Sequence, residues 1–280
     1  MPELNLQSTA RLLSGRAIPL LGLGVFQNRD NCASACLAAL KAGYRHIDSA
    51  QVYRNEDQVG LGVAKSGVDR KDIFVTSKVV SRNQGYDKTI AGVNDSLQKF
   101  GFNYLDLFLI HDPLAGKEKR LATWKALIAL RDEGKLLNIG VSNYGVHHLE
   151  EIKSAGLETP SINQIELHPW CQQKPIVEYC KKNGIVIQAY SPLVQAKSGR
   201  IDHPVLVEIA KKHGKEAAQV LIRWSLQTGH VVLPKSEKES RIISNADVYN
   251  FALDEDDLSK LNALDLGDKG AVTWNPVNAP

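Results

Sequence analysis

Short apolar runs alternate with helical patterns along most of the chain, and this alternation constrains the fold more than any other feature. Strands that alternate with helices form βαβ units within a parallel sheet. Eight apolar strands, covered on both faces, predict a closed (β/α)8 barrel, also called a TIM barrel. A doubly wound open sheet is the alternative that the pattern leaves open. The eight runs are residues 21–26, 45–49, 73–79, 104–110, 137–142, 162–167, 185–190 and 230–234.

The segments between these runs have the spacing of amphipathic helices. Residues 87–101, for example, carry Ile90, Val93 and Leu97 at helical intervals and end on Gly101, a residue type that commonly terminates helices. The same kind of pattern predicts helices at residues 31–43, 87–101, 121–135, 175–184, 203–214 and 217–229.

The two ends of the chain differ from this repeating middle. The residues before position 20 predict a small hairpin that turns at Ser14 and Gly15. An acid-rich segment at 253–264 predicts a further helix, and the polar segment 267–280 follows it. Because no linker rich in Pro, Gly or Ser divides the chain, residues 1–280 are predicted to form one domain.

Composition argues against several classes of function. The net charge is +3, which gives no reason to expect a nucleic-acid or membrane partner, and the basic run 117–120 is interpreted as a solvated loop. No apolar stretch reaches the roughly 18 residues of a transmembrane helix, and the N-terminus lacks a signal-peptide pattern. We therefore expect a cytoplasmic protein. No metal site is predicted, and packed thiols are expected at Cys32, Cys36, Cys171 and Cys180.

Polar residues gather where the predicted strands end. Chemistry in a barrel of this kind occurs at the C-terminal ends of the strands, so such a set indicates an active site. A single member could be explained by packing alone, but a polar group at almost every strand end could not. The set comprises Asp48, Lys78, His111, Ser142, Asn143, Gln164, Glu166, Tyr190, Ser191, Lys235 and Ser236.

Four of the polar residues are expected to meet, because the second, third and fourth strands are neighbours in a barrel. These are Asp48, Tyr53, Lys78 and His111. A buried lysine cation is expected to lower the pKa of a nearby phenol from about 10, and a carboxylate would keep that lysine charged. His111 could donate a hydrogen bond to the same substrate oxygen. Such a site could protonate a carbonyl oxygen while its carbon accepts hydride.

Seven motifs, in order along the chain, resemble the aldo-keto reductase family: GYRHIDSAQVYRNE, IFVTSKV, YLDLFLIHDP, IGVSNY, INQIELHP, QAYSPL and VLPKSEKESRIISN. The resemblance implies a barrel that reduces small carbonyl substrates with NADPH. It implies that Tyr53 is the proton donor, that Lys78 and Asp48 tune it, and that His111 orients the carbonyl. Members are often monomers, so a monomer is expected here.

The resemblance also implies positions for the cofactor. Ser142, Asn143 and Gln164 match residues that hold the carboxamide, and Tyr190 matches the ring that stacks on the nicotinamide. NADPH is favoured over NADH because Ser236 and Glu239 predict a capped helix start, where cations would receive a phosphate. The full predicted set is Gly24, Val25, Phe26, Asp48, Ser142, Asn143, Gln164, Tyr190, Ser191, Leu193, Gln195, Leu233, Pro234, Lys235, Ser236, Lys238, Arg241 and Asn245.

Departures from the family concentrate in the predicted substrate pocket. Phe26 and Asp112 stand where tryptophan is common in the family, and Val80 replaces a bulkier residue. The pocket should therefore be less aromatic on those walls, and Asp112 either lies at its rim or faces solvent. Short loops at 111–124 and 194–204 predict an open pocket, and the tail with Trp274 is expected over the barrel mouth. Trp170 either lines the pocket or packs beneath the tail. The predicted pocket residues are Phe26, Val52, Val80, Asp112, Trp170 and Trp274.

Two other functions remain open from the sequence. Lys78 at a barrel strand end could form a Schiff base, as in an aldolase-like lyase. Alternatively, the chain could bind nicotinamide nucleotides as the regulatory subunit of a larger assembly. In the reductase interpretation, by contrast, Asp48 holds Lys78 and the lysine forms no covalent adduct. The same site could also run in reverse and oxidise alcohols.

Overall fold

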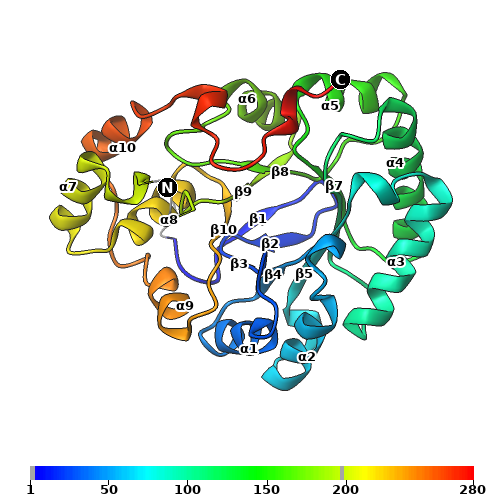
Figure 1. Ribbon diagram of the computed structural model, residues 1–280, viewed down its shortest axis with the longest axis horizontal. Helices are drawn as coiled ribbons and strands as arrows, with labels where there is room; N and C mark the ends of the chain where they lie inside the picture. Colours follow the sequence, from blue (N-terminus) through cyan, green and yellow to red (C-terminus); the bar gives the residue numbers. More distant parts are fainter. Residues whose placement is uncertain (1–3, 196–198) are drawn as a thin grey trace.

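The computed structural model describes residues 4–195 and 199–280 and contains an eight-stranded parallel sheet closed into a barrel (Figure 1). The strands are β3 (Leu23–Gly24), β4 (His46–Asp48), β5 (Phe74–Val79), β6 (Leu107–Ile110), β7 (Ile139–Ser142), β8 (Ile162–Glu166), β9 (Val186–Tyr190) and β10 (Val231–Leu233). They neighbour one another in chain order from β3 to β10. The backbone amides of Gly22 and Gly24 donate to the carbonyls of Val232 and Pro234, both at 3.0 Å, which joins the two edges. The barrel is therefore confirmed and the open sheet is wrong.

Helices surround the barrel and cover the outer faces of its strands (Figure 1). Each predicted helix is present with ends shifted by a few residues. The helices are α1 (Cys32–Lys41), α2 (Glu56–Ser66), α3 (Tyr86–Phe100), α4 (Lys117–Asp132), α5 (Val146–Ser154), α6 (Lys174–Lys182), α7 (Pro204–His213), α8 (Ala217–Gln227), α9 (Glu239–Ala246) and α10 (Glu255–Asn262).

Helices α2 and α5 were not predicted. Two glycines weaken the helical pattern of α2, although both are required by close packing. A Cβ atom on Gly60 would lie 2.1 Å from the Phe100 carbonyl oxygen, and one on Gly62 would lie 2.7 Å from the Cβ of Cys36. The glycines therefore let α2 approach α1 and α3 closely, at a cost in helix propensity that tertiary packing offsets.

The interpretation of residues 117–120 as a solvated loop is wrong. These residues form the first turn of α4, and the Arg120 side chain is buried. Its guanidinium group pairs with the Glu151 carboxylate at 2.8 Å and also donates to the Pro113 carbonyl at 2.6 Å. A charged side chain at this position is thus part of the packing between α4 and α5.

The predicted capping box at Ser236 and Glu239 is also wrong. Helix α9 begins at Glu239 with Lys238 as its N-cap residue, and no side chain caps it. The Ser236 hydroxyl instead accepts a hydrogen bond from the Lys238 backbone amide at 3.1 Å, which closes a turn before the helix. The helix therefore starts later than the sequence pattern indicates.

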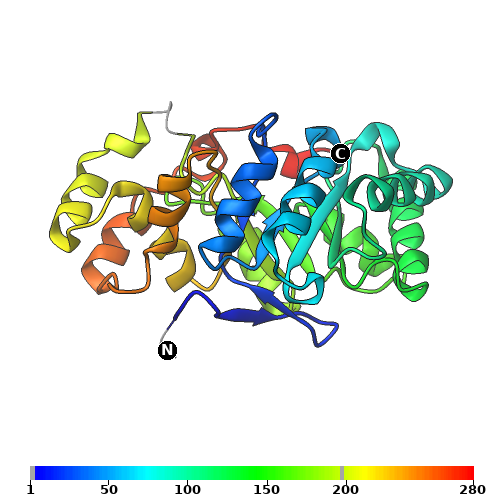
Figure 2. The same ribbon diagram turned by 90° about the horizontal axis from the view of Figure 1, so that it is seen from below.

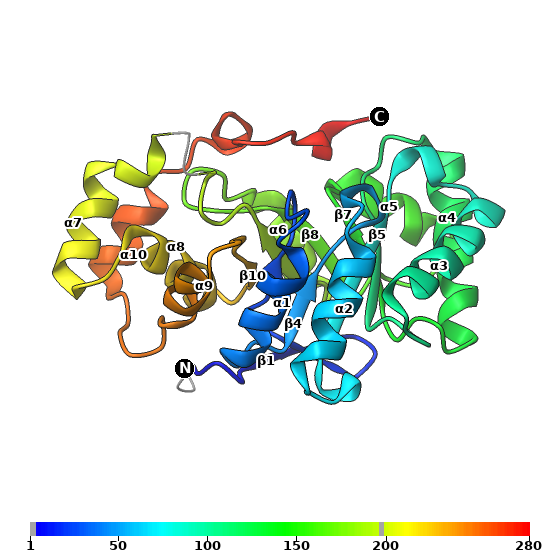
Figure 3. The same cartoon turned by 60° about the horizontal axis from the view of Figure 1, so that its bottom comes forward.

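The two ends of the chain lie at opposite ends of the barrel. The predicted hairpin is present as β1 (Thr9–Arg11) and β2 (Ala17–Pro19), and it turns at Gly15, whose φ of +84° favours glycine. Figure 2 shows this hairpin below the barrel, and Figure 3 shows the C-terminal segment crossing above the opposite end. The segment that follows α10 thus covers the mouth, as predicted.

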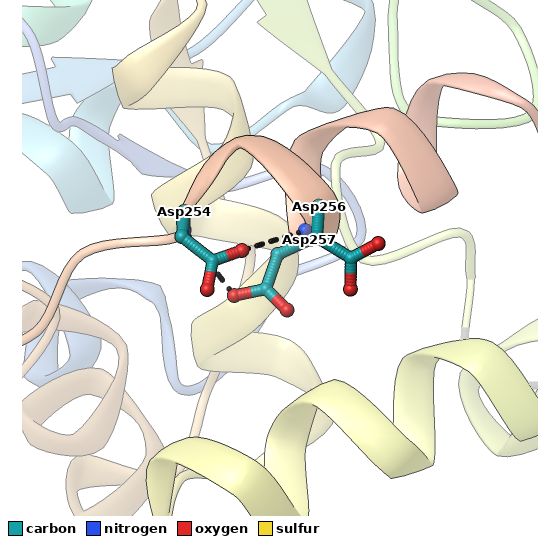
Figure 4. Close-up of side chains that lie close together, drawn as sticks. All are labelled: Asp254, Asp256 and Asp257. Carbon is teal, nitrogen blue, oxygen red and sulfur yellow. Dashed lines mark hydrogen bonds between the residues drawn. The ribbon is translucent and has the colours of Figure 1, made fainter.

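Three aspartates gather at the start of α10, where Asp254, Asp256 and Asp257 place carboxylate oxygens within 4.8 Å of one another (Figure 4). Asp254 accepts from the Asp257 backbone amide at 2.9 Å and is the N-cap residue. Lys212 pairs with Asp254 at 2.6 Å and with Asp257 at 2.8 Å. Asp256 pairs with Lys260 at 3.0 Å, so helix capping and ion pairs account for the cluster.

The remaining sequence expectations concern thiols and membranes. All four cysteines are buried and free, as expected for packed thiols. Within residues 4–195 and 199–280, no helix has the length and apolar character needed to cross a bilayer.

Candidate active site

Three adjacent strands bring the predicted catalytic residues to one end of the barrel. Asp48 is the last residue of β4, Lys78 is the penultimate residue of β5, and His111 follows the last residue of β6. Tyr53 ends the short 3-10 helix η1 (Gln51–Tyr53), which is separated from β4 by two residues. Parallel pairing of β4 with β5 and of β5 with β6 therefore juxtaposes groups that lie far apart in the sequence.

A buried ion pair forms the base of the site. The Lys78 Nζ atom lies 2.6 Å from Asp48 Oδ1 and 2.7 Å from the Ser49 carbonyl oxygen. The Lys78 side chain is 0% exposed and that of Asp48 is 4% exposed. Burial lowers the pKa of Lys78, while the Asp48 carboxylate opposes this shift. The carboxylate is thus the group that favours the charged lysine.

The Tyr53 ring lies close to both the Lys78 ammonium group and the His111 imidazole. Its centroid is 5.1 Å from Lys78 Nζ and 5.8 Å from the centroid of His111, which meets it edge-on. Burial raises the pKa of Tyr53 well above its usual value, and the negative charge of Asp48 acts in the same direction. The expectation of a lowered phenol pKa is therefore wrong. Tyr53 carries its proton at neutral pH, which is the state that a proton donor requires.

His111 is a neutral imidazole at this position. Burial lowers its pKa to about 3, and the positive charge of Lys78 contributes to the shift. Its Nδ1 atom is buried without a hydrogen-bond partner among the described residues, while its backbone carbonyl accepts from Asn143 Nδ2 at 3.0 Å. A neutral ring has one N–H donor, which suits a hydrogen bond to a carbonyl oxygen.

A line of buried polar side chains supports Asp48 from inside the barrel. Gln164 Nε2 donates to Asp48 Oδ2 at 2.8 Å and to Gln188 Oε1 at 2.6 Å. Gln188 Nε2 in turn lies 3.3 Å from His46 Nε2. The roles of Gln188 and His46 were not predicted. A glutamine inside the apolar run 185–190 was the signal that could have indicated one of them.

The side chains predicted to hold a carboxamide are present but already engaged with the protein. The Tyr190 hydroxyl donates to Asn143 Oδ1 at 2.9 Å, and Ser142 Oγ donates to the Gln164 backbone carbonyl at 2.8 Å. Because the Gln164 amide nitrogen is used by two protein acceptors, its amide oxygen is the atom able to accept from a carboxamide N–H. Asn143 Oδ1 already accepts from Tyr190, but an amide oxygen has two lone pairs and can accept a second hydrogen bond.

The C-terminal segment is held over this region by Glu166. The buried Glu166 carboxylate accepts hydrogen bonds from the backbone amides of Val272 at 2.5 Å and Thr273 at 3.0 Å, and from the Thr273 hydroxyl. His168 Nε2 lies 2.9 Å from the same carboxylate. The ring of the next residue, Trp274, lies 6.4 Å from that of His111 and meets it edge-on. This anchoring role of Glu166 was not predicted.

One tryptophan lies beneath the tail and another belongs to it. Trp170 is 4% exposed, and its carbonyl oxygen accepts from the Leu266 backbone amide at 2.9 Å. A Cβ atom on Gly270 would lie only 1.6 Å from that oxygen, so the tail packs directly on Trp170. Of the two positions predicted for Trp170, the structure places it beneath the tail. Trp274, by contrast, is 48% exposed beside the mouth.

Asp112 does not face solvent. Its side chain is buried and accepts from the backbone amides of Ser81 at 3.1 Å and Leu114 at 3.0 Å. Burial raises the pKa of this carboxyl group, and the two amide bonds oppose the shift. The carboxylate thus fixes the loop after β5, which contains the 3-10 helix η3 (Ser81–Asn83).

The other predicted pocket residues lie around Tyr53. The Phe26 ring is 5.1 Å from that of Tyr53 and is 48% exposed. Val52 and Val80 are partly buried, on η1 and immediately before η3.

The residues predicted along the pyrophosphate and adenosine lie on irregular backbone after β9 and β10. Ser191 and Gln195 have positive φ values of 50° and 40°, a conformation that is uncommon outside glycine. Ala196, Lys197 and Ser198, within the loop predicted to be short, lie outside the described residues. The remaining predicted residues near these ends are Gly24, Val25, Leu193, Leu233, Pro234, Ser236 and Asn245; all of these but Leu193 are buried.

The predicted phosphate site has two cations available. Lys235 pairs with Glu237 at 2.9 Å. Lys238 and Arg241 are exposed at the start of α9, and neither is within ion-pair distance of a carboxylate in the described part of the chain. A phosphate bound here would meet free cations and the positive end of a helix dipole, so the residues present fit NADP(H).

Comparison with known proteins agrees with this architecture. The model of the Aldo/keto reductase family matches residues 21–266. Glyoxal reductase from Bacillus subtilis (strain 168) is 47% identical over 262 residues, covering 93% of this chain and 94% of the relative. The 9,11-endoperoxide prostaglandin H2 reductase of Trypanosoma cruzi (strain CL Brener) is 46% identical over 250 residues, which is 88% of each chain.

A solved structure is similar over nearly the same span. The aldo-keto reductase of Bombyx mori, crystallised in complex with NADP, is 33% identical with a TM-score of 0.89, covering 96% of this chain and 95% of that one. The family match, the relatives and the barrel with its polar strand ends all agree. The chain is a member of the aldo/keto reductase family.

Proposed function

We propose that this protein reduces aldehydes and ketones to alcohols with NADPH, and that the same site oxidises alcohols in reverse. The observation that carries the proposal is the convergence of Tyr53 with the Lys78–Asp48 ion pair and the neutral His111 at the barrel mouth. Glyoxal reductase, a carbonyl reductase by name, aligns over almost the whole chain. The Bombyx mori structure with NADP supports the choice of cofactor.

The cofactor would lie along the strand ends from β7 to β10. Gln164, Ser142 and Asn143 would hold the carboxamide, and Tyr190 would stack on the nicotinamide. Lys238 and Arg241 would receive the phosphate that distinguishes NADPH from NADH. When bound, the reduced nicotinamide supplies the hydride that the carbonyl carbon accepts.

The side chains of the protein supply the proton and the position of the carbonyl. Tyr53 holds a proton at its hydroxyl, and that hydroxyl has no hydrogen bond to another side chain in the described residues. His111 would donate its N–H to the carbonyl oxygen and so place it for protonation. Lys78 stabilises negative charge as it develops on the phenol oxygen, and Asp48 keeps that lysine charged.

The same geometry disfavours the two other functions. A Schiff-base lysine must reach a carbonyl carbon, but the Lys78 Nζ atom is sealed from solvent and bonded to Asp48 and Ser49. A regulatory subunit needs no proton donor, yet Tyr53 and its three supporting side chains are all in place.

The test is the consumption of NADPH by the purified protein with neutral aldehydes such as methylglyoxal and benzaldehyde. We expect saturable loss of reduced-nicotinamide absorbance that requires both aldehyde and protein. NADPH binding without turnover would favour the regulatory subunit and contradict the proposal. Trapping with borohydride, followed by mass spectrometry, tests the lyase. A covalent adduct on Lys78 would favour the lyase and contradict the proposal.

A further inference from the structure

We propose that the carbonyl substrate carries a carboxylate or phosphate group, which Arg29, Arg54 and Arg82 receive at the rim of the active site. This inference rests on the proposed carbonyl reduction and narrows its substrate class. We call these three side chains the arginine rim.

The arginine rim surrounds an open cavity that also reaches the proposed proton donor. The cavity has a volume of about 720 Å³. Tyr53 and Val52 form part of its wall, so the cavity adjoins the residue proposed as the proton donor. The complete lining is Arg29, Asp30, Val52, Tyr53, Arg54, Asp57, Gln58 and Arg82.

The three guanidinium groups are available to an anion. All three residues are exposed, and none forms an ion pair within 4.0 Å in the part of the chain that the structure describes. Asp30 and Asp57 line the same cavity, so the rim has one excess positive charge. Arg70, Arg120 and Arg131, by contrast, are paired with carboxylates and are not available to a solute in this way.

The backbone that carries the rim is fixed by buried hydrogen bonds. Asn55 Nδ2 donates to the carbonyls of Val25 at 2.9 Å and Asn28 at 2.8 Å, and Asn55 Oδ1 accepts from Ser49 Oγ at 2.7 Å. These bonds join the loop that ends at Arg29 to the segment that carries Arg54. Arg82 lies in η3, whose first amide is held by the buried Asp112 carboxylate.

Arg54 also has an uncommon backbone conformation. It follows Tyr53 directly and has a φ of 56°, in the left-handed region that non-glycine residues seldom adopt. Such conformations cost free energy and cluster at functional sites. Arg54 lines the same cavity as its neighbour Tyr53.

Guanidinium groups pair with carboxylate and phosphate oxygens through two parallel hydrogen bonds. The cofactor phosphates are the other anions that could lie near the rim, since Asn28 Nδ2 donates to the Ser236 carbonyl at 3.2 Å. The cavity favours the substrate, because Tyr53 lines it whereas Lys235, Lys238 and Arg241 do not.

The experiment compares matched charged and neutral aldehydes with NADPH as cofactor. The pairs are a carboxylated benzaldehyde against its methyl ester, and glyceraldehyde phosphate against glyceraldehyde, so that carboxylate and phosphate are tested separately. Wild type should prefer the charged member of at least one pair in kcat/KM. In Arg82→Gln and in Arg54→Gln, the charged-to-neutral ratio should fall about 5- to 10-fold, the range of one exposed or partly exposed charged contact.

Arg11→Gln is the matched control, because Arg11 is an exposed arginine in β1 at the opposite end of the barrel. This variant should leave the ratio unchanged. Arg29→Gln provides a third rim variant in case either of the others folds poorly, which circular dichroism would reveal.

Three outcomes would overturn the inference. An unchanged ratio in all rim variants would do so while leaving carbonyl reduction intact, provided that the neutral aldehydes are reduced. A rise in the KM for NADPH, with the ratio unchanged, would assign the rim to the cofactor. If wild type reduced none of the four aldehydes, both the substrate proposal and the reductase function would be rejected.

Discussion

The charged side chains at the base of the active site are paired within the protein, whereas those of the nearby arginine rim are not. At the base, the Lys78 ammonium is 0% exposed and its partners are Asp48 and the Ser49 carbonyl. At the rim, Arg29, Arg54 and Arg82 are exposed, and no carboxylate in the described residues pairs with them. The buried charge is compensated within the fold, whereas the rim charges are available to a solute.

This difference predicts which substitutions should affect folding and which should affect ligand affinity. A buried charge whose partner is removed is left in a medium that solvates it poorly, so the cost falls on folding. An exposed guanidinium remains hydrated when its neighbours change, so its loss should affect ligand affinity alone. The predictions below test this separation.

Tyr53→Phe should have the largest effect on activity. We expect kcat for carbonyl reduction to fall by about 100- to 10,000-fold, since general acid catalysis contributes this much. NADPH affinity and the free energy of unfolding should change little, because the hydroxyl forms no hydrogen bond with a described side chain. Steady-state kinetics, cofactor titration and urea unfolding measure the three quantities. Turnover comparable to wild type would contradict the role of Tyr53.

Asp48→Asn should have the largest effect on stability. It leaves Lys78 buried without a compensating charge, and such losses cost about 3–5 kcal/mol. The matched control is Asp95→Asn, which removes the carboxylate from an ion pair of the same 2.6 Å length with Lys99. Because both of those side chains are half-exposed, we expect that change to cost less than about 0.5 kcal/mol. Equal losses of stability in the two variants would contradict the expected difference between a buried and an exposed ion pair.

Sequence alone predicted that the proposed catalytic residues meet, because barrel topology fixes their positions. Once Asp48, Lys78 and His111 were placed at the ends of adjacent strands, their convergence followed without knowledge of any contact. The eight strands were found for a related reason, since a buried parallel strand is a continuous apolar run. Helix α2 was missed because the glycines that let it pack closely also weaken its helical signal.

What could not be predicted depends on contacts between distant segments. The pKa of Tyr53 is raised because burial outweighs the neighbouring lysine, and the balance requires the fold. Glu166 was recognised as a polar strand end, but its bonds to Val272 and Thr273 join residues more than a hundred positions apart. Asp112 resembled a pocket residue, yet it binds backbone amides.

Buried histidines should make the stability of the fold depend on pH. Burial lowers the pKa of His230 to about 4, whereas an unfolded histidine titrates near about 6.5. The unfolded state therefore binds more protons between these values, and stability should fall as pH drops below about 6.5. His46 and His148, also with pKa values lowered to about 4, contribute in the same direction. The loss from one such group is about 2 kcal/mol at pH 5.

Urea unfolding between about pH 7 and pH 5 measures this dependence. His230→Gln is the informative variant, because the only cause of its pKa shift is burial and its replacement cannot titrate. The slope of stability against pH should be shallower in this variant than in wild type. Identical slopes would show that His230 does not contribute.

The smallest effect is expected at Arg241, an exposed charge that we propose binds a cofactor phosphate. Arg241→Ala should raise the KM for NADPH about 10-fold and leave that for NADH nearly unchanged, because NADH lacks the phosphate that the guanidinium would bind. The free energy of unfolding should stay within about 0.5 kcal/mol of wild type, as for most exposed sites. Added salt should reduce the difference in KM for NADPH between wild type and variant, since screening weakens exposed ion pairs. An equal rise in KM for both cofactors would show that Arg241 does not bind that phosphate. A large loss of stability would show that this exposed arginine contributes to folding as well as to binding.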